Sequence, residues 1–208
     1  MHPNPAFRGD TSARNLAFAR QRGFGVLAVN DDHGPLISHV PFLLNEDGTQ
    51  AHLHLVRSNP IVRRLDDACP AVIAVSGPDG YISPDWYGLP DQVPTWNYVA
   101  VHLRGTLRRL PDDALRPILD AVSDDFEDGL APKPPWRTAK MDPNAMDRMM
   151  RAIVPIRLDI DTVDGTWKLG QNKPEDARLG AAKGVGNGTA GQETQALARL
   201  MRDPPPAK

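Results

Sequence analysis

The segment at residues 55–63, LVRSNPIVR, carries side chains that are suited to binding an anion. An apolar run ends just before Arg57, Ser58 and Asn59, and the proline that follows is typical of the first position of a helix. A guanidinium, a hydroxyl and free backbone N–H groups would then meet at a helix N-terminus, which is a favourable seat for phosphate. Ordinary capping of that helix by Asn59 explains the same residues equally well, so both interpretations stay open.

An aromatic segment, Tyr81–Tyr98, holds all three tyrosines and two of the four tryptophans of the chain. Its rings alternate with prolines and with Ser, Asp, Asn and Gln side chains, a mixture that neither a helix nor a strand needs. Tyrosine and tryptophan lose few torsions when they become ordered, and each carries one polar atom. The composition therefore favours a stiff rim around a flat ligand or another subunit. A well-packed surface loop is the alternative interpretation.

The histidines could form a metal or haem site. His52 and His54 share one face of a predicted strand, whereas His39 and His102 belong to other strands. No Cys, Asp or Glu stands at ligand spacing from them, and neutral, satisfied histidines are commoner than ligands. We therefore predict no metal site.

Two further motifs lie towards the C-terminus. WKLGQN at 167–172 adds a cationic and polar cluster after the last predicted strand, although a surface turn would look the same. GNGTAG at 186–191 matches the GxGxxG pattern of dinucleotide-binding sites literally. Because that mechanism requires a strand directly before the glycines, and none is evident, we interpret this motif as a flexible linker.

Length and composition limit the possible domain organisation, location and partners of the protein. With 208 residues, the chain can bury one substantial core, and we expect one domain over residues 1–180 and a flexible linker with a C-terminal helix over 181–208. The single cysteine, Cys69, cannot form an internal disulfide, and no apolar run reaches the length of a signal peptide or membrane span. A cytoplasmic location without membrane attachment is expected. The formal net charge of −2 gives no global field for nucleic acid, so DNA binding is possible but unsupported by charge or motif.

Alternating apolar residues predict the elements that position these side chains. Helices are expected at residues 11–22 and 59–65 and within an insertion at about 112–152, and the Asp-Gly pair at 164–165 predicts a turn. Six strands, mostly antiparallel, with helices outside favour a mainly β fold that closes as a small barrel. The strands are expected at residues 24–29, 35–44, 49–57, 70–77, 98–110 and 153–162.

Five motifs resemble, in order and spacing, the PaiB-type FMN-binding negative transcriptional regulators. They are SHVPFLL (38–44), HLVRSNP (54–60), GPDGYISPDWY (77–87), VPTWNYVAVHLRG (93–105) and WKLGQN (167–172). The resemblance spans residues 1 to about 180. It implies a fold similar to that of pyridoxamine-phosphate oxidases, a six-stranded antiparallel split β-barrel that dimerises and holds FMN in two clefts between subunits. The chain departs from the family pattern at Gly170, where the family more often has Ser.

The resemblance also implies roles for particular residues. The strand from Ser38 to Leu44, which includes His39 and Val40, would lie along the isoalloxazine and offer backbone N–H and C=O groups to its pyrimidine edge. Three further sets of residues would bind the phosphate, form one wall of the flavin cleft, and approach the flavin from the other side. The last set could come from the same subunit or from the partner subunit. The sets are His54, Arg57, Ser58 and Asn59 for the phosphate; Trp96, Asn97 and Tyr98 for the wall; and Trp167, Lys168 and Gln171 for the opposite side.

The function expected from this resemblance is that of an FMN-binding homodimeric negative transcriptional regulator or redox sensor. A flavin-dependent oxidoreductase acting on a small molecule is the alternative, and a haem-binding split-barrel protein is the third. The fold alone does not decide between them, and the sequence identifies no catalytic residue.

Overall fold

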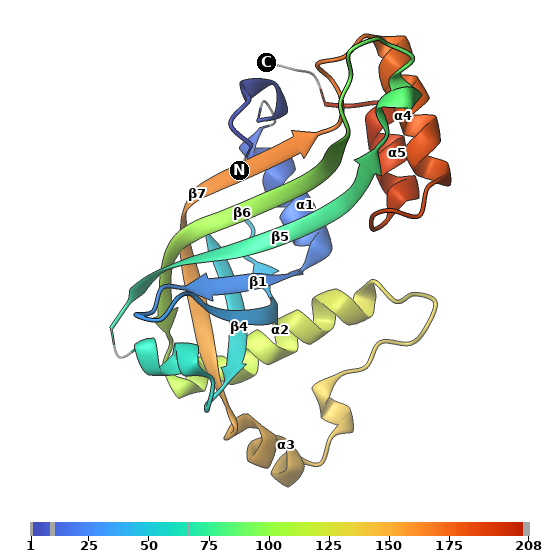
Figure 1. Ribbon diagram of the computed structural model, residues 1–208. Coiled ribbons are helices and arrows are strands. Elements are labelled where there is room, and N and C mark those ends of the chain that lie inside the picture. The colour runs from blue at the N-terminus through green and yellow to red at the C-terminus, as the bar shows by residue number, and fades with distance from the viewer. Residues whose placement is uncertain (1, 9–10, 66, 206–208) are drawn as a thin grey trace. The chain divides into compact units, whose positions relative to one another are not determined.

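The computed structural model describes residues 2–8, 11–65 and 67–205. In it, seven strands form one sheet in the order β2-β1-β5-β6-β7-β4-β3 (Figure 1). The pairings of β1 with β2 and β5, and of β4 with β3 and β7, are antiparallel. The strands are β1 (Phe24–Val29), β2 (Leu36–Pro41), β3 (Leu43–Leu44), β4 (Gln50–Val56), β5 (Cys69–Ile82), β6 (Thr95–Arg109) and β7 (Ile153–Lys168).

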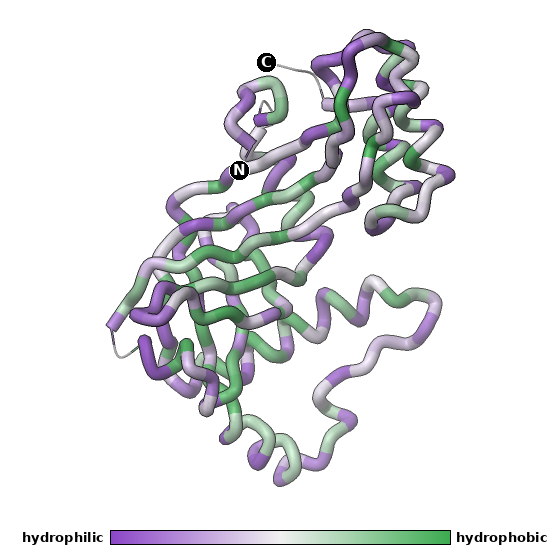
Figure 2. The backbone as a smooth tube through the Cα atoms, viewed as in Figure 1, coloured by the Kyte–Doolittle hydropathy of each residue, from purple (hydrophilic) through white to green (hydrophobic). Residues whose placement is uncertain are grey.

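The strands form where apolar residues recur at every second position. In β4, for example, Ala51, Leu53 and Leu55 are buried on one face, while His52 and His54 occupy the other. Figure 2 shows hydrophobic positions concentrated along the strands. This pattern fixes the register, since a slip by one residue would expose the buried set.

The prediction of a mainly β split barrel with peripheral helices is confirmed, but the sheet has seven strands where six were expected. The predicted strand at 35–44 is interrupted at Phe42, which is buried and donates its N–H to the Gly23 oxygen at 2.9 Å. Beyond it, Leu43 pairs with His52 of β4. The chain therefore leaves β1 at this residue and joins β4 as β3.

The chain forms two compact units, each assembled from separate segments. Unit 1 comprises residues 1–18, 75–102 and 163–208, and unit 2 comprises residues 19–74 and 103–162. Strands β5, β6 and β7 contribute to both. The domain over residues 1–180 that the sequence suggested stays a prediction.

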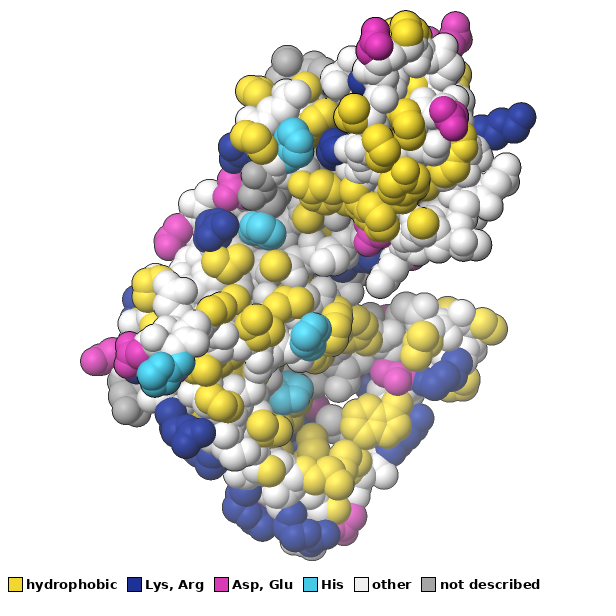
Figure 3. Space-filling view, viewed as in Figure 1, with side chains coloured by type: hydrophobic (Ala, Val, Ile, Leu, Met, Phe, Trp, Pro, Cys, Tyr) yellow, Lys and Arg dark blue, Asp and Glu magenta, His cyan; other side chains and the backbone are white. Residues whose placement is uncertain are grey.

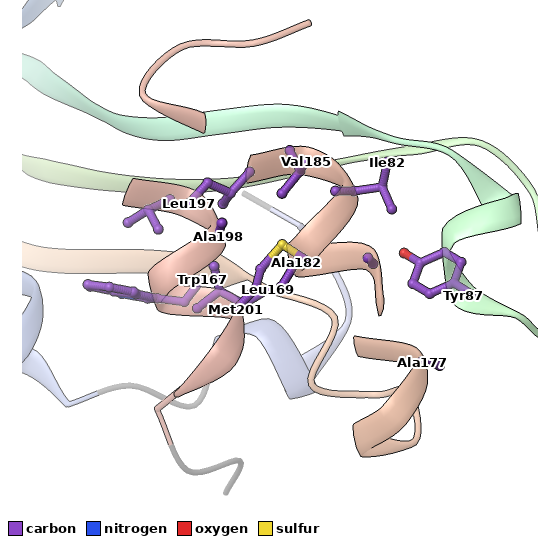
Figure 4. Close-up of a cluster of buried hydrophobic side chains, with 12 residues drawn as sticks. Ile82, Tyr87, Trp167, Leu169, Ala177, Ala182, Val185, Leu197, Ala198 and Met201 are labelled. Carbon is purple, nitrogen blue, oxygen red and sulfur yellow. The ribbon is translucent and has the colours of Figure 1, made fainter. Parts of the chain in front are cut away.

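In unit 1, helices α4 (Glu175–Asn187) and α5 (Thr194–Arg202) pack together and α4 also contacts the short helix η3 (Pro84–Tyr87). Glycines permit this approach, because a Cβ at Gly184 would lie 2.2 Å from the Trp86 ring. The resulting core is shown in Figure 4 and includes Tyr87, Trp167 and Met201. Residues 181–187 lie in α4, where Ala181, Ala182, Val185 and Gly186 are buried, whereas the sequence suggested a flexible linker after residue 180. The GNGTAG motif begins in the last two residues of α4 and is not preceded by a strand, which agrees with its rejection as a dinucleotide site.

In unit 2, helix α2 (Leu115–Asp128) packs on β3 and β4, and β2 also approaches β4. The predicted insertion contains this helix and α3 (Pro143–Met150), which Asp142 caps by accepting from the Ala145 N–H at 2.9 Å. The remaining elements are short 3₁₀ helices and one helix near the N-terminus. They are η1 (Pro5–Phe7), α1 (Ser12–Arg22), η2 (Pro60–Arg64), η4 (Asp112–Ala114) and η5 (Thr138–Lys140).

The turn predicted at residues 164–165 is wrong, because β7 runs without a break from Ile153 to Lys168. Gly165 is needed there for a different reason: an added Cβ would lie 2.1 Å from the side-chain oxygen of Asn15. No helix in the described part of the chain is long and apolar enough to cross a membrane.

Candidate functional site

Arg57 lies at the end of β4 in unit 2, where its guanidinium is already partly occupied. Its Nε donates to the Arg151 oxygen at 3.1 Å and its Nη2 donates to the Ile153 oxygen at 3.2 Å. A carboxylate oxygen of Asp112 lies 3.6 Å from Nη2, and 44% of the Arg57 side chain remains exposed. Arg57 is thus held in one orientation while part of its guanidinium stays accessible to an anion.

Asn59 caps the 3₁₀ helix η2, as the capping interpretation of this segment proposed. Its Oδ1 accepts from the Ile61 N–H at 2.9 Å, and its backbone oxygen accepts from the Val62 N–H at 3.0 Å. These two N–H groups are therefore not free for a phosphate, and the expectation of open N–H donors at this helix start is wrong for both. Ser58 stays exposed beside them.

The same asparagine connects two parts of the predicted flavin site. Its Nδ2 donates to the Ser38 Oγ at 2.7 Å, which fixes the start of η2 against β2. Within β2 the side chains alternate, so that His39 is exposed and stacks on Phe24 at 6.4 Å, whereas Val40 is buried. Because β2 pairs only with β1 among the described strands, half of its backbone N–H and C=O groups point away from the sheet. Such an edge can bind the polar edge of a flat ring.

His54 lies on the opposite face of β4 from the core. Its Nδ1 is buried without a hydrogen-bond partner in the described part of the chain, and burial lowers the pKa of this imidazole. Burial also lowers the pKa of His52, with a further contribution from the charge of Arg157. Both features indicate neutral imidazoles. The described residues contain no group of three or more metal-ligating side chains.

In unit 1, the three predicted wall residues of β6 do not form one surface. Trp96 is 44% exposed and donates from Nε1 to the Asp79 Oδ1 at 3.3 Å, and the half-buried Tyr98 shares its face. Asn97 points the other way, is 1% exposed and donates to the Met201 sulfur at 3.6 Å. Successive strand residues face opposite sides, so only Trp96 and Tyr98 can serve one aromatic wall.

The predicted site residues of the WKLGQN turn at the end of β7 also have different structural roles. Trp167 is buried and donates from Nε1 to the Asn15 Oδ1 at 2.8 Å. Gln171 braces the turn, since its Oε1 accepts from the Leu169 N–H at 2.9 Å and its Nε2 donates to the Trp167 oxygen at 2.6 Å. Lys168 alone of the three predicted residues reaches an open site, where its Nζ donates to the Thr95 Oγ1.

That site is a cavity of about 370 Å³ in unit 1, which contains Asn97 and Lys168 of the predicted set. Sequence reasoning missed the rest of it, although Lys173 directly follows the WKLGQN motif and could have been included. The other lining residues come from the N-terminal segment, η3 and the loop after it, and the turn beyond β7: His2, Asn4, Phe7, Tyr87, Asp91, Gln92, Val93, Thr95, Gly170, Asn172 and Lys173.

The chain is similar to known proteins in sequence and in fold. The sequence family described as "Putative FMN-binding domain" matches residues 1–162. The chain is 26% identical over 188 residues to the protein named "Protease synthase and sporulation protein PAI 2" of Bacillus subtilis (strain 168), with 89% of each chain covered.

Two solved structures share the fold. The FAD and heme binding protein from Mycobacterium smegmatis superposes with a TM-score of 0.57 at 22% identity, covering 89% of this chain and 82% of that one. The flavocytochrome Anf3 from Azotobacter vinelandii gives a TM-score of 0.54 at 14% identity, covering 81% and 73%. At these identities the likeness concerns the fold alone.

Proposed function

Because this chain belongs to the family described as "Putative FMN-binding domain", we propose that it is a cytoplasmic, homodimeric FMN-binding protein of the PaiB type that regulates transcription or senses redox state. The observation that carries the proposal is the match over residues 1–162, which includes β2, the turn from β4 to η2, and β6. The similarity to the Bacillus subtilis protein over 89% of both chains supports the same family of flavoproteins.

In this proposal, unit 2 supplies the polar contacts to FMN. The unpaired backbone edge of β2 at Ser38, His39 and Val40 binds the pyrimidine edge of the isoalloxazine. The exposed part of the Arg57 guanidinium and the Ser58 hydroxyl bind the phosphate, because charge-assisted hydrogen bonds to phosphate are stronger than neutral ones. Asn59 acts by holding η2 against β2. The other predicted contacts, His54, Trp96, Asn97, Tyr98, Trp167, Lys168 and Gln171, remain predictions.

The outer face of β1 and β2 supports the homodimer. Phe24 and Ile37 are 50% and 58% exposed, and the register places Ile37 beside Ala28 and His39 beside Val26 on this face. Hydrophobic side chains gather over β1 in the view of Figure 3. Exposed apolar side chains that adjoin one another on a sheet face favour association with a second surface. A second copy of the chain is the partner that we propose.

Titration of the purified protein with FMN, FAD and riboflavin tests the cofactor. The fluorescence of FMN should decrease when it binds, and the melting temperature of the protein should rise. Riboflavin should bind more weakly because it lacks the phosphate. Absence of a spectral change and of stabilisation with every flavin would exclude the proposed cofactor. Sedimentation velocity should give a dimer that Phe24→Asp and Ile37→Asp weaken. Rapid bleaching of bound FMN by NADH or NADPH would instead favour the oxidoreductase.

A further inference from the structure

The cavity in unit 1 is built by segments that lie far apart in the sequence. Three N-terminal residues (His2, Asn4 and Phe7), the loop at 91–93, the start of β6 and the turn after β7 contribute to its lining. Its volume of about 370 Å³ lies in the range of small-molecule sites and exceeds the space that a single ordered water needs.

The charge of this lining is predominantly positive. Lys168 and Lys173 contribute ammonium groups, and Asp91 is the sole acidic side chain among the lining residues that the structure describes. Lys168 donates to the Thr95 hydroxyl and Lys173 donates to the Gln92 carboxamide oxygen, both of which are neutral acceptors. Neither lysine forms an ion pair with a described carboxylate. Two neighbouring cations without a carboxylate partner create a potential that attracts anions.

Burial of the Lys168 ammonium and of the Asn97 amide costs free energy unless each group has a strong hydrogen-bonding or ionic partner. Lys168 is half-buried, and removal of its ammonium group from water lowers its pKa. Asn97 also lines the cavity and is 1% exposed, and among the described residues its Nδ2 donates to the Met201 sulfur, which is a weak acceptor. A bound anion would offset the desolvation of Lys168 and offer the Asn97 amide a stronger acceptor.

The turn after β7 and the contacts of the two lysine side chains restrain the cationic groups. Gly170 has φ of +80°, which favours glycine, and the Lys173 N–H donates to the Gly170 oxygen at 3.0 Å. Gln171 closes the same turn through its two side-chain hydrogen bonds. The Lys173 Nζ also lies 5.3 Å from the centroid of the Tyr87 ring. The site is therefore preorganised, which reduces the entropic cost of binding.

We propose that this cavity binds a small organic anion, a carboxylate or phosphate monoester with a compact apolar body, as a ligand additional to the flavin. Lys168 and Lys173 bind the anionic group, Asn97 donates a further hydrogen bond, and Tyr87, Phe7 and Val93 form the apolar wall. This assigns Lys168 and Asn97 to the anion and not to the flavin. It does not depend on whether FMN binds to unit 2.

Isothermal titration of the full-length protein with phenyl phosphate and benzoate, at constant ionic strength, tests the site and distinguishes the two anion classes. Phenol and benzamide serve as neutral analogues and inorganic sulfate as a test of simple ion binding. At least one aromatic anion should bind saturably at one site per chain, and the neutral analogues should not. Equal affinity for sulfate and the aromatic anion would contradict the role of the apolar wall.

Substitutions then locate the site. Lys173→Gln and Lys168→Gln should each weaken binding by about tenfold or more, because each removes one charge-assisted contact. Lys183→Gln changes an exposed lysine of α4 outside the cavity and should leave binding unchanged. Lys173→Gln keeps the test valid if Lys168→Gln does not fold, and equal affinity in Lys173→Gln and Lys183→Gln would overturn the proposal.

Competition between the anion and FMN tests whether the two ligands occupy different sites. Anion binding should persist at saturating FMN. Mutually exclusive binding would show that the cavity belongs to the flavin site and would overturn the assignment of an additional ligand. Anion binding without any flavin binding would contradict the proposed function and leave the anion site supported.

Discussion

The Nε1 of Trp167 donates a hydrogen bond to the Oδ1 of Asn15 at 2.8 Å, and this contact joins the end of β7 to α1 within unit 1. Both side chains are almost completely buried, at 5% and 4% exposure. A buried indole N–H without an acceptor is costly, so this pair constrains the start of the WKLGQN turn, of which Trp167 is the first residue.

Replacement of Asn15 by Leu should therefore lower the free energy of unfolding by about 1–3 kcal/mol, because the Trp167 N–H loses its acceptor. Urea denaturation of Asn15→Leu, Trp167→Phe and the double variant measures this. The double variant should be more stable than the sum of the single changes implies, since it leaves no unpaired donor. Additive losses would contradict a direct coupling.

Gly105 marks a close approach of β6 to β7 in unit 2. A Cβ at this position would lie 1.8 Å from the backbone oxygen of Asp159, which no side-chain rotation can relieve. We expect Gly105→Ala to cost about 3 kcal/mol or more, at the upper end of overpacking effects. Gly129→Ala is the matched control, because its Cβ would meet atoms only at 3.4 Å and beyond. Melting temperatures of the two variants should differ clearly, and similar values would refute the steric explanation.

The sequence predicted the sheet well because its signal is local. Alternation of buried and outward side chains, as in β4, follows from the period of two in any strand. The break at Phe42 and the unbroken path of β7 through Gly165 were not predictable in this way. In both cases a tertiary contact decides, the hydrogen bond to Gly23 in the first and the packing against Asn15 in the second.

In the candidate sites, too, the locally determined features were predictable and those that depend on tertiary contacts were not. The predicted capping by Asn59 is local and is present, whereas its bond to Ser38 joins residues that are 21 positions apart. The aromatic segment was interpreted as one rim, but Trp96 and Asn97 are adjacent in β6 and face opposite sides. Strand alternation alone could have shown that they do not share a wall, had β6 been expected to begin at Thr95.

The C-terminal helices complete the core of unit 1. Leu197 of α5 is fully buried in the cluster with Ile82 and Val99. Leu197→Ala should cost about 2–5 kcal/mol, the usual range for truncation of a buried leucine. Leu179→Ala on α4 changes a side chain that is 38% exposed and should cost much less. Denaturant titration compares them, and an equally small effect of both would support a flexible tail.

The proposed phosphate contacts predict an order of effects on FMN affinity. Arg57→Ala should weaken FMN binding more than Lys168→Ala, because the Arg57 guanidinium has a fixed orientation suited to binding phosphate, whereas Lys168 lines the cavity in unit 1. Ser58→Ala should weaken it by a smaller factor. Fluorescence titration gives the affinities, with exposed Arg63→Ala as the control for loss of positive charge near η2. If Lys168→Ala has the larger effect, the phosphate lies elsewhere.

His54 should make the stability of the protein depend on pH. Burial lowers its pKa in the folded state below the ordinary value of 6.5, so between the two values the unfolded chain binds more protons than the folded chain. The free energy of unfolding therefore rises with pH through this window, and stability is lost as the pH falls from 6.5 through the lowered pKa.

His54→Gln should reduce the slope of stability against pH below 6.5 without abolishing it, because burial also lowers the pKa of His52. Urea midpoints measured from pH 7 downward give the slope for each protein. His33→Gln removes an exposed histidine and controls for a general change in charge. An unchanged slope in His54→Gln would mean that this imidazole is protonated as readily in the folded protein as in the unfolded chain, in conflict with its buried and unpaired Nδ1.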